Sequence, residues 1–185
     1  MVEVEVKIPV KNKKQVEEKL LELGFLKGDL LKESDFYFDN ACHELKEKDM
    51  ALRIRSCENL TTSTTEHFIT YKGPKMDKIS MTRKELETKI ESAETGREIL
   101  KSLGYTEVPP VIKRRQELHK DQMNACLDQV EHLGDFLELE IVVQQESEKE
   151  NALNELISLL YELGYQAEDI IRTSYLSMLQ NKESK

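Results

Sequence analysis

Residues 2–8, VEVEVKI, alternate apolar and charged side chains without interruption. This alternation predicts a β-strand with one face buried against apolar groups. Glutamate is a poor strand former, so an ordinary surface strand is expected to carry Thr, Ser or Lys on its other face. Here that other face is formed by Glu3, Glu5 and Lys7. Two carboxylates and an ammonium on the first strand therefore suggest that this face serves a site.

The same alternation recurs along the chain, in ALRIR (51–55), RKELE (83–87), VIKRR (111–115) and FLELE (136–140). In each stretch, charges at alternate positions point to one side of the strand, and the residues between them, which are mostly apolar, point to the other. A solvated sheet face would explain any one of them. Their recurrence favours charges that converge on the inside of a closed sheet. With helical periodicity at 13–23, 92–105, 148–165 and 167–182, the pattern predicts an α+β fold with an antiparallel sheet or barrel.

Composition limits which partners the protein is expected to bind and which compartment it is expected to occupy. The chain of 185 residues has 36 acidic and 27 basic residues and a net charge of −9, which disfavours nucleic acid and anionic membranes as partners. Cys42, Cys57 and Cys126 form no CxxC motif and indicate free thiols in a reducing compartment. We expect one domain over residues 1–185, without a signal peptide or transmembrane segment, in the cytoplasm.

A closed sheet with a charged interior must be wet and internally compensated, because an unpaired buried charge is very costly. The first and last strands would be neighbours in such a sheet, and both carry an ExE pair. Carboxylates gathered there would suit Mg²⁺ or Mn²⁺. The bases around the rest of the wall would hold a polyanion, since guanidinium groups match phosphate oxygens in bidentate fashion. These bases are Lys7, Arg53, Arg55, Lys72, Arg83, Lys113 and Arg115. A metal beside a ring of bases suits a triphosphate.

These segments also resemble a known family. EVEVK (3–7) resembles the ExExK signature of the CYTH superfamily, the triphosphate tunnel metalloenzymes. DFYFD (35–39), ALRIR, TYKGP (70–74), RKELE, IKRR (112–115), LDQVEHLGDFLELE (127–140) and SYLSML (174–179) follow in the family's order, over essentially the whole chain. The resemblance implies an eight-stranded antiparallel closed β-barrel with flanking helices, whose lumen binds a triphosphate with a divalent metal.

The resemblance also implies roles for single residues. The expected metal ligands are Glu3, Glu5, Asp128, Glu138 and Glu140. The expected catalytic residues are Glu5, Lys7 and Glu138, and the bases named above are the expected triphosphate ligands. Glu85 and Glu87 could bind metal or pair with lumen bases. Asp35, Tyr37 and Asp39 are expected to be mainly structural, and Tyr175 to be a core residue or to line the tunnel mouth. His132 stands where the family often has Gly.

The motifs leave the reaction open, because the same lumen could serve several. The spacing resembles class IV adenylyl cyclases most closely, which form cyclic AMP and pyrophosphate from ATP. The alternatives are an inorganic or thiamine triphosphatase and a noncatalytic nucleotide- or polyphosphate-binding module. A small-molecule triphosphate is the expected partner, bound by a monomer or a homodimer. The loop at residues 73–79, with Lys75 and Lys78, is expected to close over the bound triphosphate.

Overall fold

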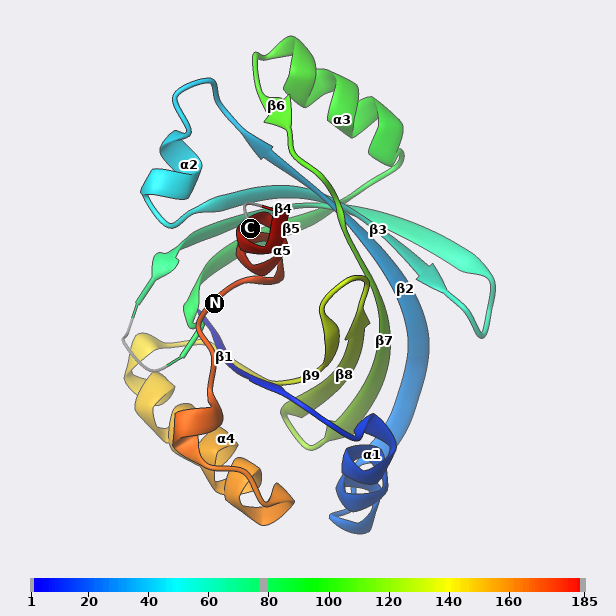
Figure 1. Ribbon diagram of the computed structural model, residues 1–185, viewed down its shortest axis with the longest axis vertical. Coiled ribbons are helices and arrows are strands. Elements are labelled where there is room, and N and C mark those ends of the chain that lie inside the picture. Colours follow the sequence, from blue (N-terminus) through cyan, green and yellow to red (C-terminus); the bar gives the residue numbers. More distant parts are fainter. Residues whose placement is uncertain (1, 77–79, 184–185) are drawn as a thin grey trace.

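A computed structural model describes residues 2–76 and 80–183, which form a closed antiparallel β-barrel with helices around it (Figure 1). The strands pair in the order β3-β4-β5-β1-β9-β8-β7-β2, and β2 also pairs with β3, which closes the barrel. The short β6 pairs with the end of β2. The strands are β1 (Val2–Pro9), β2 (Leu26–Asp39), β3 (Ala51–Asn59), β4 (Thr64–Lys75), β5 (Arg83–Ile90), β6 (Thr106–Glu107), β7 (Val111–Lys120), β8 (Met123–Val130) and β9 (Gly134–Val143). The expected α+β barrel is confirmed, with β6 as an additional strand.

The first strand is inverted relative to a surface strand: its apolar face points outward and its charged face points into the barrel. Val4, Val6 and Ile8 are fully buried in the main apolar cluster, which also holds Leu156 and Leu160 of the helix α4. This cluster therefore lies outside the barrel wall, between the sheet and the helices. Burying apolar side chains there is the main stabilising term, and it leaves the lumen for charged groups.

The described helices are α1 (Lys13–Glu22), α2 (Glu44–Glu47), α3 (Ala93–Ser102), α4 (Lys149–Leu163) and α5 (Tyr175–Glu183), with 3₁₀ turns at Glu146–Glu148 and Ala167–Asp169. The Asn12 side chain accepts a hydrogen bond from the Gln15 amide and so caps α1. None of the described helices is long and apolar enough to span a membrane. The cytoplasmic location stays a prediction.

The last helix is shorter than expected. The sequence pattern predicted helix from residue 167, but α5 begins only at Tyr175. The Ile171 amide donates a hydrogen bond to the Lys7 carbonyl oxygen (2.8 Å), so the preceding segment is bound to β1 instead of forming a helical turn. The helical prediction was wrong for residues 170–174 because this tertiary contact overrides local periodicity.

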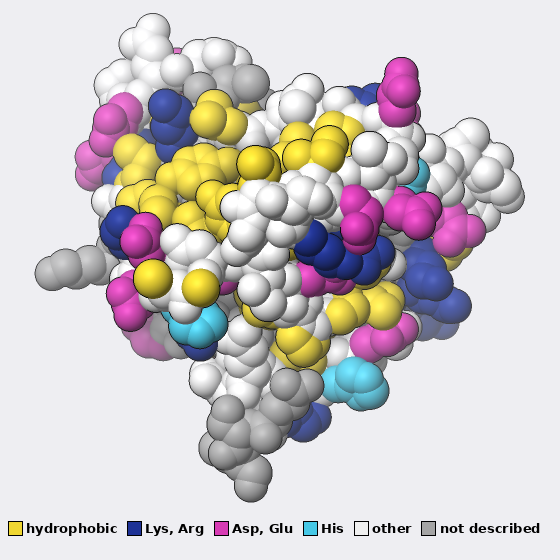
Figure 2. Space-filling view, turned by 90° about the horizontal axis from the view of Figure 1, so that it is seen from above, with side chains coloured by type: hydrophobic (Ala, Val, Ile, Leu, Met, Phe, Trp, Pro, Cys, Tyr) yellow, Lys and Arg dark blue, Asp and Glu magenta, His cyan; other side chains and the backbone are white. Residues whose placement is uncertain are grey.

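The outer surface carries charges of both signs. Figure 2 shows the face above the barrel, where hydrophobic side chains gather in one area and acidic and basic side chains lie interspersed beside it. The described cysteines are all free, as expected: Cys42 is exposed, Cys57 half-buried and Cys126 buried.

Candidate functional site

The charged faces of the strands enclose a cavity of about 650 Å³. All seven bases expected to face the lumen line it: Lys7, Arg53, Arg55, Lys72, Arg83, Lys113 and Arg115. The acidic residues Glu3, Glu5, Glu138 and Glu140 line it as well, as do Glu85 and Glu87. The alternation read from the sequence therefore assigns these side chains to the correct face of each strand.

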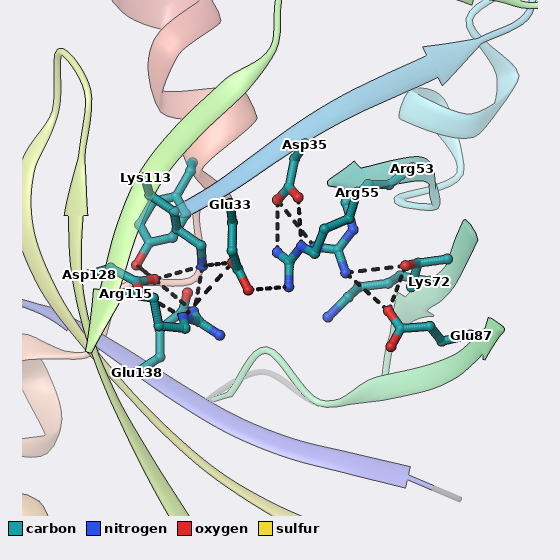
Figure 3. Close-up of polar contacts among 12 residues, drawn as sticks. Glu33, Asp35, Arg53, Arg55, Lys72, Glu87, Lys113, Arg115, Asp128 and Glu138 are labelled. Atoms are coloured by element: carbon teal, nitrogen blue, oxygen red, sulfur yellow. Dashed lines mark hydrogen bonds and ion pairs between the residues drawn. The ribbon is translucent and has the colours of Figure 1, made fainter. Parts of the chain in front are cut away.

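On the β7 side of the cavity, bases and acids form a closed network (Figure 3). The Lys113 ammonium lies 2.7 Å from an Asp128 carboxylate oxygen and 3.2 Å from Glu33. The Arg115 guanidinium donates to both Asp128 oxygens at 2.7 Å and also to Glu138. The Glu138 pKa is well below its ordinary value: burial acts to raise it, but Lys113, Arg115 and Lys7 outweigh burial. In this part of the wall each base is therefore paired with carboxylates.

The β3 side repeats this arrangement. Arg55 donates to the two oxygens of Asp35 at 2.6 and 2.8 Å and lies 2.9 Å from Glu33. Arg53 lies 3.3 Å from Asp35. Burial acts to raise the pKa of Asp35, but the two guanidinium groups hold it well below its ordinary value. We call the bases of both sides, Lys7, Arg53, Arg55, Lys113 and Arg115, the basic wall.

Four carboxylates from three adjacent strands form a contrasting region, which we call the acidic corner: Glu3, Glu5, Glu85 and Glu140. Glu5 lies opposite Glu140 in the β1–β9 register. The Glu5 side chain is nearly buried, and no described residue donates a hydrogen bond or forms an ion pair to its carboxylate. Burial, reinforced by Glu138 and Glu3, raises its pKa to about 8.

Two other members of the corner also hold protons more tightly than usual. Burial and a hydrogen bond with Glu3 raise the pKa of Glu85 to about 7, and burial and the Glu3 charge raise the pKa of Glu140. Glu3 is the exception: burial acts to raise its pKa, but Lys72, whose ammonium lies 3.0 Å away, lowers it to about 2. The acidic corner thus has more negative charge than its neighbours compensate.

This excess of carboxylates fits a divalent cation, which would replace the protons that the corner otherwise retains. Among the described residues, no three His, Cys, Asp or Glu side chains are gathered tightly enough to form a complete coordination shell. A cation here would therefore share one or two carboxylates with water and substrate oxygens, as Mg²⁺ commonly does. The donor set is all oxygen, as Mg²⁺ and Mn²⁺ prefer.

Asp128 differs from the other expected metal ligands. It is fully buried and is absent from the cavity lining, behind Lys113 and Arg115. The Tyr175 hydroxyl donates to the same carboxylate at 3.1 Å. The ligand role expected for Asp128 stays a prediction, and its contacts favour a role in holding the bases in place.

Glu33 is a member of the network that the sequence analysis missed. Its side chain is nearly buried between Arg55, Lys113 and Arg115, and these bases outweigh burial and lower its pKa to about 2. The signal was available, because Glu33 and Asp35 are an i, i+2 acidic pair on β2.

The structure shows the contacts of the acidic residues whose roles the sequence did not decide. Glu85 and Glu87 pair with lumen bases: Glu85 with Lys72 at 2.7 Å, and Glu87 with Arg53 at 3.6 Å. Asp39 accepts hydrogen bonds from backbone amides at and just after the start of α2, which is a structural role.

The loop that is expected to close is described only in part. The Lys75 ammonium lies 2.6 Å from Asp49, and both residues line the cavity. Lys78 lies outside the described residues, so closure of residues 73–79 over a ligand stays a prediction.

Comparison with known proteins fits this arrangement. The model of the CYTH domain family matches residues 1–175. The chain belongs to the CYTH family. The Methanocaldococcus jannaschii protein named "Putative adenylate cyclase MJ0240" is 43% identical over 178 residues, covering 96% of this chain and 98% of that protein. Members of the CYTH family act on small triphosphates.

Solved structures of CYTH-like proteins share the fold. The protein PH1819 from Pyrococcus horikoshii is 35% identical with a TM-score of 0.88, covering 97% of this chain and 99% of that one. HpAC1 from Hippeastrum, whose structure is reported to reveal a dominant triphosphatase activity, is 17% identical with a TM-score of 0.70, covering 98% of this chain and 95% of that one. The second likeness shows the fold alone.

Proposed function

We propose that this CYTH protein is a divalent-metal-dependent enzyme that converts ATP to 3′,5′-cyclic AMP and pyrophosphate. The observation that carries the proposal is the division of one cavity into an acidic corner and a basic wall. The first can take a cation, and the second can take the phosphate oxygens. The adenylate cyclase name of a relative 43% identical over nearly the whole chain supports the cyclase reaction.

The basic wall binds the triphosphate chain in this proposal. Its guanidinium groups present more N–H donors than their carboxylate partners use, and the buried Nε of Arg53 has no hydrogen-bond partner among the described residues. A phosphate oxygen can accept from the unused N–H groups that face the cavity, whereas Arg53 Nε is covered by protein. Lys7 and Lys113 add compact positive charges that neutralise the phosphates.

The acidic corner, together with Glu138, provides the cation site. Glu3, Glu5, Glu138 and Glu140 are the candidate ligands, of which a cation would take one or two directly. Glu5, Lys7 and Glu138 are the residues that we place nearest the reaction. A bound cation supplies charge neutralisation on the phosphate and leaving-group oxygens. Glu138 lies 3.7 Å from Lys7 and so connects the two regions.

The reaction itself is a substitution at phosphorus. The ribose 3′-hydroxyl oxygen forms a bond to the α-phosphorus, the bond from that phosphorus to the bridging oxygen breaks, and pyrophosphate leaves with this oxygen. The hydroxyl proton passes to solvent. The protein contributes mainly by holding the triphosphate in line and stabilising the charge that moves to the leaving oxygen.

A triphosphatase is the second candidate, because the same cavity suits attack of water on the terminal phosphorus. HpAC1, which shares the fold, is reported to have a dominant triphosphatase activity, and this supports a triphosphatase as the alternative. A noncatalytic binding module would bind a triphosphate without turnover, and the acidic corner would then have no catalytic use.

The deciding experiment supplies ATP, thiamine triphosphate and inorganic triphosphate separately, with Mg²⁺ or Mn²⁺, and identifies the products. Cyclic AMP with an equal amount of pyrophosphate supports the proposal. Release of inorganic phosphate from any of the three supports the triphosphatase instead. Glu138→Gln should abolish turnover, whereas Arg114→Ala, at an exposed position on the same sheet, should retain it. Binding without any turnover in the wild type would contradict both reactions.

A further inference from the structure

The segment that ends in α5 is fastened across one opening of the barrel. Ile171 is bound to β1 through the Lys7 carbonyl oxygen, and Arg172 donates to the Ser80 carbonyl oxygen at 3.2 Å. The Lys182 ammonium donates to the His132 carbonyl oxygen at 2.7 Å. Figure 1 shows α5 within the outline of the barrel when the molecule is viewed in this direction. We call residues 171–182 the C-terminal strap.

Tyr175 extends from the strap into the cavity and is 7% exposed. The Lys7 ammonium lies over its ring, 4.2 Å from the ring centroid. The Lys113 ammonium lies 5.3 Å from the same centroid. Both distances are within the range of cation–π attraction, which is strongest where the cation is shielded from water. The ring also packs against Phe136, with centroids 5.0 Å apart.

The hydroxyl of Tyr175 reaches a second group. It donates to Asp128 Oδ2, the atom that also accepts from Lys113 and Arg115. One side chain thus contacts Lys7 and Lys113 directly and Arg115 through Asp128. A buried tyrosine hydroxyl needs a hydrogen-bond partner, and here that partner is the carboxylate that holds two bases.

We propose that Tyr175 is a positioning residue, which fixes Lys7, Lys113 and Arg115 in the geometry that binds triphosphate. This inference rests on the proposed function of the cavity. It makes the C-terminal strap part of the binding site, although no strand of the barrel belongs to it. Docking of the strap and triphosphate binding are therefore coupled, since each requires the same orientation of the bases.

Two substitutions separate the contribution of the Tyr175 ring to binding from that of its hydroxyl. Tyr175→Phe keeps the ring beneath the ammonium groups and removes the hydrogen bond to Asp128, whereas Tyr175→Leu removes both. We expect the Kd of inorganic triphosphate, measured calorimetrically, to rise about threefold for Phe and at least tenfold for Leu. KM should rise with it while kcat changes less. Tyr161→Leu, at an exposed tyrosine of α4, is the matched control and should leave Kd unchanged.

A double-mutant cycle tests the hydroxyl independently of stability. Asp128→Asn and Tyr175→Phe remove the two ends of one contact, so their effects on Kd should be clearly less than multiplicative in the double variant. Multiplicative effects, or a wild-type Kd in both Tyr175 variants, would overturn the inference. If the wild type binds no triphosphate at all, the proposed function of the cavity fails first.

Chemical modification of lysines tests the position of Lys7 without any ligand. It therefore applies even if the wild type binds no triphosphate. The side chains of Lys7 and Lys113 are 2% and 3% exposed, so an amine-acylating reagent should modify them slowly in the wild type. Peptide mass spectrometry should find Lys7 modified at least fivefold faster in Tyr175→Leu, relative to Lys14, whose side chain is 85% exposed. Equal modification of Lys7 in variant and wild type would show that Tyr175 does not position it.

Discussion

Glu5→Gln should make the stability of the metal-free protein less sensitive to pH. Glu5 is a nearly buried carboxyl group beside Glu3 and Glu138, and no described residue pairs with it. Burial and these neighbouring charges raise its pKa from 4.5 to about 8. Glutamine keeps the shape of the side chain and cannot ionise, so the comparison isolates the charge.

The sign and size follow from linkage. Below pH 4.5 Glu5 is protonated in both the folded and the unfolded chain. Between pH 4.5 and pH 8 the unfolded chain releases a proton that the folded chain keeps, so each pH unit lowers the free energy of unfolding by about 1.4 kcal/mol. From pH 6 to pH 8 the wild type should lose roughly 2–3 kcal/mol more than Glu5→Gln. Contributions from groups common to both proteins cancel in this difference.

The assay is urea unfolding of both proteins at several values between pH 6 and pH 8, with a chelator present. Glu131→Gln, which removes an exposed carboxylate, is the control and should run parallel to the wild type. Parallel curves for Glu5→Gln and wild type would refute the reasoning, because Glu5 would then be ionised and compensated in the folded protein. Added Mg²⁺ should raise the free energy of unfolding of the wild type at pH 8, and it should raise that of Glu5→Gln by less.

The remaining predictions concern the basic wall, a strained turn and the loop after β4. Arg115→Ala should weaken binding of inorganic triphosphate by about 1.5–3 kcal/mol, the scale of a charged hydrogen bond, and Arg114→Ala should not; equal effects in calorimetry would mean that the faces of β7 are wrongly assigned. His132 has a positive φ of 65°, so His132→Gly should stabilise the protein by roughly 0.5–1 kcal/mol in thermal unfolding, and a lowered Tm would count against strain there. Lys75→Ala should raise the KM for triphosphate, because Lys75 lines the cavity; an unchanged KM would leave its contact with Asp49 as purely structural.

The barrel and most of its lumen could be predicted because a strand has a period of two. Alternation alone places Arg53 and Arg55 on one face, and the same holds for Glu138 and Glu140. The pairing of β1 with β9 was expected from closure of the sheet and is confirmed by the register, in which Glu5 lies opposite Glu140.

Alternation does not predict how deeply a side chain is buried. Asp128 is on the lumen face of its strand, yet the longer side chains of Lys113 and Arg115 cover it, and their reach depends on how neighbouring strands pack. The late start of α5 was missed for a related reason. The hydrogen bond from Ile171 to Lys7 joins residues distant in sequence, so no local pattern records it.

The pairing of the first strand with the last has a consequence for synthesis of the chain on the ribosome. Val2 pairs with Val143, so β1 stays unpaired along that edge until the chain has been made as far as residue 143. Such long-range pairing makes folding slow and leaves an open strand edge that can join another chain. The acidic corner is likewise divided between β1, β5 and β9. The three strands that carry these carboxylates therefore come together only after β9 has been made, so the proposed cation site forms late in folding.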